Sequence, residues 1–418
     1  MTRAASRLRS TVIVSGTAAA LAVSIAVAAT SAAHGDAASG SSRHAGHADK
    51  RSLVIVGHGF GHGHGMSQYG AQGAALQGVK YRHIVDFYYP HTAWAHAHGR
   101  IRVLISADTT SDLEVRPAPG LVVRDSRRRH SWTLPTGGRY YRWRLHPLPN
   151  GFTAVEYLSK SGWHRWHIPD GRKTFKTDAE FHARGPLRLL VPGGRDVVGV
   201  PYRGTLRLAS PSSGSRARDT VNVLSLDAYV KGVVPYEMPA SWRQPALRAQ
   251  AVAARTFAAW ERSQNRDGDY QICDTTSCQV YGGLPAEQHS SNRAVDATAG
   301  KIVTYHGRPA MAQFASSSGG WTSYGGEPYL PAKKDPWDGF SGNPMHTWSD
   351  RVSASVLERD HPGIGRLLAI HVLTRDGHGA WGGRVESVVL RGSKGKAHVT
   401  GDDIRWAYGL PSDWFRVE

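Results

Sequence analysis

The sequence predicts an α+β protein in which short strands outnumber helices. Glycine is frequent, at 47 of 418 residues, and short β-like runs alternate with turns from about residue 113 to residue 205. A single long stretch, about 243–262, has helical periodicity, and no alternation of strands with helices indicates a parallel doubly wound sheet. We therefore expect one β-rich domain with a few helices.

The N-terminus has the order of regions that is typical of a secretory signal peptide. Three arginines precede an uncharged run at 11–30, and the small residues Ser31-Ala32-Ala33 then supply a cleavage site. We expect residues 1–33 to be removed and the mature chain to be secreted, in the cell wall or outside the cell. The alternative is an uncleaved membrane anchor, because the weakly apolar run is almost long enough to span a bilayer.

The charge points to an anionic partner. The formal net charge is +18, and removal of residues 1–33 takes away three arginines and no acidic residue, which leaves +15. A strongly basic chain often binds nucleic acid. Here the basic residues are spread along the chain, apart from Arg127-Arg128-Arg129, and the chain is expected to be exported. We expect an anionic cell-wall polymer as the partner, with no nucleic acid and, after cleavage, no membrane; a basic surface that serves only solubility is the alternative.

The other elements follow in order along the chain. Residues 34–50 are small and polar and are typical of a flexible linker, so the folded domain is expected over 51–418. Within it we expect a strand at 51–56, a Gly-rich loop with a short helix at 67–76, a strand at 101–106, short strands from 113 to 205, a strand and a short helix at 219–234, and a short helical run within 402–415.

The helix at about 243–262 is rich in alanine and has one apolar face. The residues of this face recur at i, i+4, i+7 and i+11: Leu247, Ala251, Ala254 and Ala258. Ser241-x-x-Gln244 fits a capping box, and Pro245 is tolerated in a first turn. A face this small predicts close packing against a neighbouring element.

Glu237 is the first candidate for acid–base chemistry. It lies in Val-Val-Pro-Tyr-Glu-Met-Pro, just before the long helix, and its apolar neighbours would desolvate the carboxyl group and raise its pKa. A carboxyl group that stays neutral near pH 7 can protonate a leaving oxygen. The alternative is an exposed loop glutamate, or one at a helix start that the helix dipole favours.

The loop at 57–65, GHGFGHGHG, is the second candidate. His58, His62 and His64 lie within seven residues, and H-x-H spacing can ligate zinc. However, the H-E-x-x-H motif is absent, and glycines do not favour the rigid helix that such motifs use. We therefore favour a loop that lines a substrate site or supports the fold, with no metal or other cofactor. A zinc hydrolase is the alternative.

Three serines and two cysteines complete the set of candidates. Ser316, Ser317 and Ser318 lie beside glycines, and because the chain has no G-x-S-x-G elbow we expect them to line a polar groove rather than supply a nucleophile. Cys273 and Cys278 lie five residues apart in a chain expected to be exported, which favours a small local disulfide. Metal binding shared with a nearby histidine is the alternative.

Three segments of the chain form one combined pattern. The longest is VNVLSLDAYVKGVVPYEMPASWRQPALRAQAVAARTFA at 221–258, and the others are AQFASSSGGWTS at 312–323 and GHGHGMSQYGAQGAA at 61–75. Together they resemble the SpoIID/LytB family, the group of stage II sporulation protein D and the amidase enhancer. The resemblance covers most of 51–106 and 200–418. It thins over about 107–199, which we take as the variable β region of the domain.

The order of these segments departs from the usual pattern of the family. The GHG-x-GMSQ segment usually lies near the C-terminus, after a stretch similar to residues 387–418, whereas here it comes first. This arrangement resembles a circular permutation, which requires neighbouring termini. We therefore expect Glu418 to lie near Arg51 and the strand at 51–56 to pack beside the C-terminal segment.

The resemblance implies a peptidoglycan lytic transglycosylase. Such an enzyme cleaves the MurNAc–GlcNAc bonds of glycan strands, preferably strands without stem peptides, and leaves 1,6-anhydro-MurNAc ends. The family's catalytic acid matches Glu237, which would act first as the acid and then as the base toward the sugar's own C6 hydroxyl, so that one carboxylate replaces the usual pair. The alternative is a non-catalytic wall-binding protein that enhances a cell-wall amidase.

The resemblance also suggests which residues line the glycan groove. Hydrogen bonds to sugar hydroxyls and N-acetyl groups are expected from His64, Ser67, Gln68, Gln250, Arg255, Ser316, Ser317 and Ser318. Stacking against sugar faces is expected from Tyr69, Trp242 and Tyr281.

Overall fold

Two hydrophobic cores organise the part of the chain that the computed structural model describes, which is residues 52–126, 130–176, 178–194, 196–212, 215 and 217–418. The predicted signal peptide, the linker at 34–50, Arg51 and the arginines at 127–129 lie outside the described residues. Helices and several mostly antiparallel sheets confirm the predicted α+β class. None of the described helices has both the length and the apolar character needed to cross a lipid bilayer.

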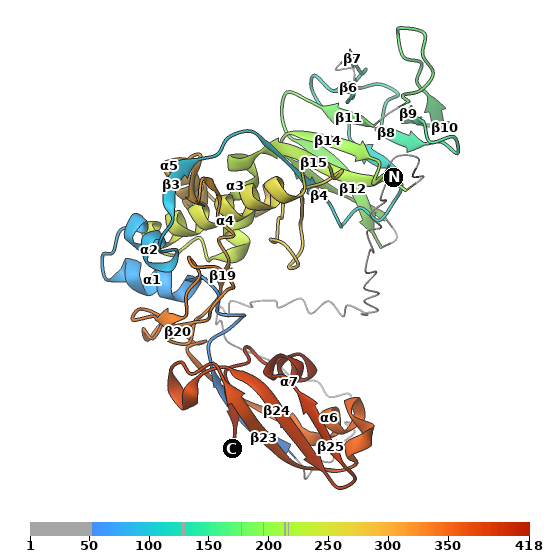
Figure 1. Ribbon diagram of the computed structural model, residues 1–418. Helices are drawn as coiled ribbons and strands as arrows, with labels where there is room; N and C mark the ends of the chain where they lie inside the picture. Colours follow the sequence, from blue (N-terminus) through green and yellow to red (C-terminus); the bar gives the residue numbers. More distant parts are fainter. Residues whose placement is uncertain (1–51, 127–129, 177, 195, 213–214, 216) are drawn as a thin grey trace, which may run out of the picture. The chain divides into compact units, whose positions relative to one another are not determined.

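Four helices of the larger core, α1, α2, α3 and α5, pack around a fifth, α4 (Figure 1). Their bounds are α1 Gln68–Leu76, α2 Tyr81–Tyr88, α3 Leu226–Glu237, α4 Gln244–Gln264 and α5 His289–Ala297. The predicted face of α4 is completely buried, which confirms the close packing. The predicted capping box is wrong: α4 begins three residues after Ser241, its N-cap is Arg243, and no side chain caps it. Pro245 lies in the first turn, where its missing N–H costs nothing.

Two larger sheets carry the β-rich half of this core. The seven-stranded sheet has the order β16 (Ile272–Cys273), β4 (Arg100–Leu104), β15 (Asp219–Ser225), β14 (Thr205–Ala209), β11 (Ala179–His182), β6 (Val122–Asp125), β7 (Ser131–Thr133). The six-stranded sheet has the order β10 (Gly162–Arg165), β9 (Thr153–Ser159), β8 (Arg142–Pro147), β5 (Leu113–Val115), β12 (Leu187–Gly193), β13 (Asp196–Tyr202). Strand β15 leads directly into α3, so the sheet sets where α3 begins.

Small strand pairs join the loops near the helices. They are β18 (Arg308–Pro309), β17 (Lys301–Tyr305) and β3 (Ala93–His96) in one sheet, β19 (Phe314–Ala315) with β2 (Met66–Ser67), and β20 (Trp321–Thr322) with β21 (Lys333–Lys334). The parallel pair β19·β2 matters for the site, because it ties the start of α1 to the serine-containing loop.

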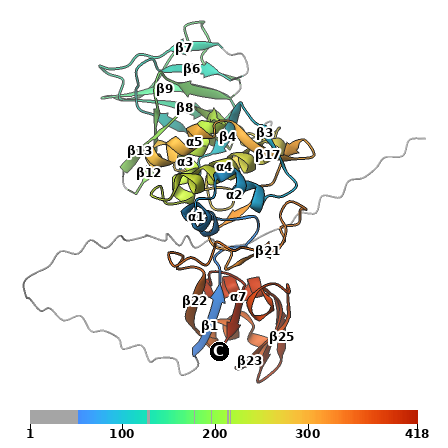
Figure 2. The ribbon, with the colours of Figure 1, turned by 90° about the vertical axis from the view of Figure 1, so that its left-hand side faces the viewer.

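The smaller core contains both ends of the domain. One of its sheets has the order β22 (Thr347–Ser353), β1 (Ser52–His58), β26 (Phe415–Val417), and the other has β23 (Leu367–Arg375), β24 (Val385–Gly392), β25 (Lys396–Val399). The helices α6 (Ala354–Asp360) and α7 (Gly401–Tyr408) accompany them. Figure 2 shows the blue strand β1 among the red C-terminal strands.

The predicted contact between the first strand and the C-terminal segment is present. Strand β1 pairs antiparallel with β26, with Ile55 opposite Val417, and the backbone N–H of Glu418 donates to the Val54 carbonyl at 2.9 Å. Because the pairing is antiparallel, a short turn could join Glu418 to Ser52 as in a β-hairpin. This geometry meets the requirement that a circular permutation places on the termini.

Candidate active site

A pocket of about 340 Å³ lies at the C-terminal end of α3. Its lining comes from segments that are far apart in the sequence: the Gly–His loop, the end of α3, α4, the loop after Cys273 and the segment before the serines. The lining residues are His62, Glu237, Phe257, Thr276, Ser277, Cys278, Gln279, Val280, Gln313 and Phe314. All three segments that carry the family resemblance therefore meet at one cavity.

Glu237 is the last residue of α3 and is half-buried in the pocket wall. Desolvation raises the pKa of its carboxyl group to about 7, from a usual value of 4.5. The C-terminal end of a helix carries partial negative charge, which also disfavours a carboxylate there. Gln68 opposes this shift weakly, because its side-chain Nε2 donates to Glu237 Oε2 at 3.5 Å. Glu237 thus ends a helix, rather than beginning one or lying in an exposed loop.

Gln68 is held at the first turn of α1 by the cap of that helix. Ser67 is the N-cap, and its Oγ accepts from the Gly70 N–H at 2.9 Å. The same hydroxyl donates to Asp338 Oδ1 at 2.6 Å. The structure therefore gives Ser67 a supporting role below the surface instead of the predicted contact with the glycan, and the side chain next to it faces Glu237.

Asp338 is the centre of a buried polar network that holds three loops together. Its carboxylate is completely buried and accepts hydrogen bonds from Ser67, Ser317, the Ser318 and Gly319 N–H groups, Asn343 and His346. Burial acts to raise its pKa, but these hydrogen bonds hold the pKa below its usual value. Asp335 lies beside it and accepts from Tyr88 and Ser318, and burial with the nearby Asp338 charge raises the pKa of Asp335 to about 6.

The glycines of the first motif allow the loop to approach other backbone closely. At Gly65 the φ angle is +68°, and an added Cβ would lie 2.1 Å from the Gln313 carbonyl oxygen. The Met66 N–H donates to that same oxygen at 3.2 Å. A side chain at Gly65 would therefore push the histidine loop away from the segment that lines the pocket.

The three histidines of this loop do not share one site. His58 packs against Trp414 and Trp381, whereas the rings of His62 and His64 contact each other with centroids 4.7 Å apart. Desolvation and nearby cationic groups lower the pKa of both His62 and His64, which keeps the two rings neutral at pH 7. Among the described residues, no group of three or more His, Cys, Asp or Glu side chains is arranged to hold a metal ion.

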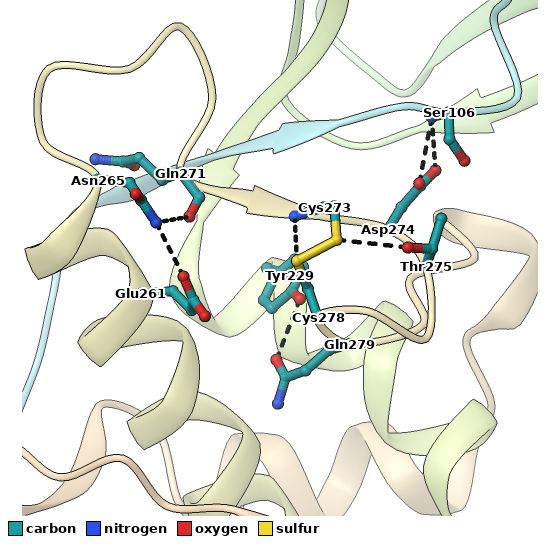
Figure 3. The surroundings of a disulfide bond; sticks show 10 residues. All are labelled: Ser106, Tyr229, Glu261, Asn265, Gln271, Cys273, Asp274, Thr275, Cys278 and Gln279. Atoms are coloured by element: carbon teal, nitrogen blue, oxygen red, sulfur yellow. Dashed lines mark hydrogen bonds between the residues drawn. A yellow bond between two sulfur atoms is a disulfide. The ribbon is translucent and has the colours of Figure 1, made fainter. Parts of the chain in front are cut away.

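A disulfide between Cys273 and Cys278 shapes part of the pocket wall (Figure 3). The loop it closes contains the pocket residues Thr276 and Ser277. Two further contacts hold the loop: Asp274 accepts from the Ser106 N–H, and Gln279 accepts from Tyr229 at 3.1 Å. The cysteines thus fix the shape of the wall and are not metal ligands in this structure.

Some of the predicted groove residues lie where a glycan could reach them. Tyr69 and Trp242 are half-buried and their rings contact each other at 4.9 Å. Ser316 is also half-buried, and its carbonyl accepts from the Tyr69 N–H at 2.9 Å. His64 is half-buried beside the pocket residue His62.

Other predicted groove residues are buried, and direct contact of these residues with a glycan stays a prediction. Arg255 is completely buried and bonds Asp227 and backbone carbonyls, while Tyr281 is 5% exposed and donates to Asn222. Gln250 is completely buried within α4. Ser317 and Ser318 are buried around Asp338 and Asp335. Arg255, Tyr281, Ser317 and Ser318 bond other groups of the protein and so support the fold around the pocket.

Several residues of the site were missed by the analysis of the sequence. Phe257, Thr276, Ser277, Val280 and Gln313 line the pocket, and Asp335 and Asp338 hold its loops. Thr276 and Ser277 lie between the cysteines, and Gln313 lies three residues before Ser316. Their closeness in sequence to these motifs could have identified them as candidate site residues. The aspartates lie in the loop-rich segment 331–346, where no pattern distinguishes them.

Comparisons with known proteins find relatives of this chain. Residues 215–305, which include Glu237 and both cysteines, match the family model described as SpoIID, stage II sporulation protein. The stage II sporulation protein D of Bacillus subtilis is 36% identical over 230 residues, which are 48% of this chain and 63% of that protein. Its counterpart in Bacillus amyloliquefaciens is 34% identical over 231 residues, 47% of this chain and 62% of that protein.

A third relative carries the other name of the family. The amidase enhancer of Bacillus subtilis is 40% identical over 135 residues, which are 31% of this chain and 17% of that protein. In all three comparisons the chain spans less than two thirds of the relative's length. The matches confirm the resemblance that the motifs of the sequence predicted.

Proposed function

We propose that this chain, which carries a domain of the SpoIID/LytB family, is a peptidoglycan lytic transglycosylase that acts outside the cytoplasm after removal of residues 1–33. The observation that carries the proposal is the position of Glu237 in the pocket together with the raised pKa of its carboxyl group. Its carboxyl group has a pKa of about 7, and it is the one acidic side chain among the described residues that line the pocket. A group of this kind is half protonated at neutral pH, so it can give a proton and later take one back.

The proposed reaction needs no second carboxylate. Protonated Glu237 transfers its proton to the oxygen of the MurNAc–GlcNAc bond, and the bond between that oxygen and C1 of MurNAc breaks. The resulting carboxylate then takes the proton of the C6 hydroxyl of the same MurNAc, whose oxygen bonds to C1. The glutamate ends protonated, no water is consumed, and the product carries a 1,6-anhydro ring. A hydrolase would instead need a second group to activate water.

The neighbours of Glu237 suit this cycle. The Gln68 amide stabilises the carboxylate that forms after the first transfer, through the contact at 3.5 Å. The neutral His62 adds no positive charge that would lower the pKa of the acid. Thr276 and Ser277 bring hydroxyl groups to the same pocket, where they can bond sugar substituents.

The test uses the chain from residue 34 onward, with wild type and Glu237→Gln incubated with glycan strands that carry or lack stem peptides. Mass spectrometry is expected to find 1,6-anhydro-MurNAc ends with wild type alone. The matched control is Glu386→Gln, which removes an exposed glutamate of β24 and should leave cleavage unchanged. Ordinary reducing ends would refute the intramolecular attack, and anhydro ends from Glu237→Gln would refute the role of Glu237.

The alternative is a wall-binding protein that enhances an amidase, as the name of the third relative suggests. It predicts that wild type binds the glycan strands without cutting them. A purified amidase would then cleave intact wall faster in the presence of either wild type or Glu237→Gln. Retention of an acid with a raised pKa in a pocket favours the enzyme, because binding alone has no need of such a group.

A further inference from the structure

The excess positive charge of the chain is concentrated in the region 113–209. This range holds 18 Lys and Arg against 7 Asp and Glu, so it accounts for +11 of the total +18, contrary to the expected even spread. Five of the seven acidic residues are already in ion pairs with arginines: Glu114, Asp125, Glu156, Asp170 and Glu180. Most of this range lies within about 107–199, over which the resemblance to the family thins.

Several exposed cations of this region have no carboxylate partner among the described residues. They are Arg116, Arg139, Lys160, Lys173, Lys176, Arg184 and Arg188. Unpaired charges in such number repel one another when the protein is alone. A polymer with regularly spaced negative charges would relieve this repulsion, so the region is suited to binding a polyanion.

Two of these cations line a pocket of about 530 Å³ at one end of the six-stranded sheet. The pocket, here called the β9–β10 pocket, is formed by residues at the turn between β9 and β10 and by residues just before β8. Its lining residues are Gly138, Arg139, Tyr141, Tyr157, Ser159, Lys160, Ser161 and His164. It is separate from the Glu237 pocket, with which it shares no lining residue.

Hydroxyl and imidazole groups converge within the β9–β10 pocket. The Oγ atoms of Ser159 and Ser161 lie 2.8 and 2.9 Å from His164 Nε2 and 2.9 Å from each other. Hydroxyl groups beside a guanidinium and an ammonium group provide the donors that bind phosphate oxygens. The pocket thus combines charge and hydrogen bonding at one place.

The aromatic rings of this pocket do not provide a surface for stacking bases. The Tyr157 ring stacks on His164 with centroids 5.2 Å apart, and the Arg139 guanidinium lies 5.6 Å from the same ring centroid. Tyr141 remains exposed, at 43%. Proteins that bind single-stranded nucleic acid stack successive bases on free ring faces. One exposed ring does not meet that need, whereas a polyol chain requires none.

We propose that the β9–β10 pocket, with the unpaired cations around it, binds an anionic cell-wall polymer whose repeating unit is a polyol phosphate. Arg139 and Lys160 pair with its phosphates, and Ser159 and Ser161 bond its oxygens. The region 113–209 then holds the chain on the wall while the Glu237 pocket acts on the glycan. The inference depends on charge and on this pocket, and it does not require Glu237 to be catalytic.

The test measures binding of fluorescent poly(glycerol phosphate) to the chain from residue 34 onward at several salt concentrations. The double variant Arg139→Gln/Lys160→Gln should bind about tenfold more weakly at physiological salt, and the slope of log K against log salt should fall by about 2, one for each lost phosphate contact. The matched control is Lys394→Gln/Lys396→Gln, which removes two exposed lysines at the start of β25 and just before it and should bind as wild type does.

Three outcomes would overturn the inference. Equal weakening by both double variants would mean that net charge alone attracts the polymer. Tighter binding of single-stranded DNA than of poly(glycerol phosphate), with the same dependence on Arg139 and Lys160, would mean a nucleic-acid site. Full competition by uncharged glycan strands would mean recognition of sugar rather than phosphate. Glu237→Gln should keep wild-type binding to the polymer, so a failure of the proposed catalysis and a failure of this proposal can be told apart.

Discussion

Replacing Glu237 by Gln should make the protein more stable at alkaline pH, although it removes the proposed acid. Burial raises the pKa of this carboxyl group from 4.5 to about 7 in the folded protein. Below pH 4.5 this carboxyl group is protonated in both the folded and the unfolded chain, so its ionisation does not change the free energy of unfolding. As the pH rises from 4.5 to 7 the unfolded chain ionises first, so the folded protein loses stability, and above 7 the loss is constant. Glutamine has nearly the same shape and does not ionise.

The expected size follows from the shift. Each unit of pKa corresponds to about 1.4 kcal/mol, so the free energy of unfolding of the variant, relative to wild type, should rise by about 2.5 kcal/mol between pH 5 and pH 8.5. Urea denaturation at the two pH values measures this difference. Glu386→Gln, at an exposed position, should give the same difference from wild type at both pH values. A change below about 0.5 kcal/mol for Glu237→Gln would refute the desolvation of this carboxyl group and its use as an acid at neutral pH.

Three further predictions concern the surroundings of this acid and the arrangement of the chain termini. Gln68→Ala removes a hydrogen bond that favours the carboxylate, so the alkaline limb of the pH–rate profile of glycan cleavage should move up by roughly half a pH unit; an unchanged limb would count against the contact. Asp338→Asn replaces one carboxylate oxygen by an NH2 group, which cannot accept the hydrogen bonds that backbone N–H groups donate there. The free energy of unfolding, measured in urea, should therefore fall by about 3 kcal/mol; a loss under 1 kcal/mol would contradict a central role of Asp338 in the buried network. A circular permutant that joins Glu418 to Ser52 through two glycines and opens at the exposed turn 136–138 should keep the wild-type circular dichroism spectrum and cleavage; an unfolded product would contradict the pairing of β1 with β26.

The sequence predicted elements well where a local pattern decides the structure. The apolar face of α4 repeats with helical spacing, and the alanine-rich run after Ser67 forms the predicted short helix, α1. Strand β1 is an apolar run that a glycine-rich loop ends. The predicted N-cap of α4 was wrong because a four-residue pattern such as Ser241-x-x-Gln244 is common and does not by itself fix where a helix begins. The chain before Gln244 is extended at Arg243, so the serine does not reach the first turn.

The candidate site was predicted in part, because residue type does not tell which face a side chain occupies. Glu237 was found from its apolar neighbours in the sequence, and desolvation in the folded protein raises its pKa as that analysis expected. Tyr281 was expected to stack on sugars but lies inside the core, since an aromatic ring serves either purpose. Asp338 was missed because its partner Ser67 lies 271 positions away, and no local pattern records a contact of that range.

The loop at 57–65 explains why the order of the motifs along the chain need not disturb the site. On one side it is fixed to the smaller core, where the His58 and Gly61 N–H groups donate to the carbonyls of Trp414 and Pro411, both at 2.9 Å. On the other side Met66 is fixed to Gln313, and the helix that follows presents Gln68 to Glu237. These contacts act through space, so they are the same whether the loop is reached from residue 418 through a turn or from a separate N-terminal segment. What the site requires is that β1 remain between β22 and β26, because that pairing sets where the loop begins.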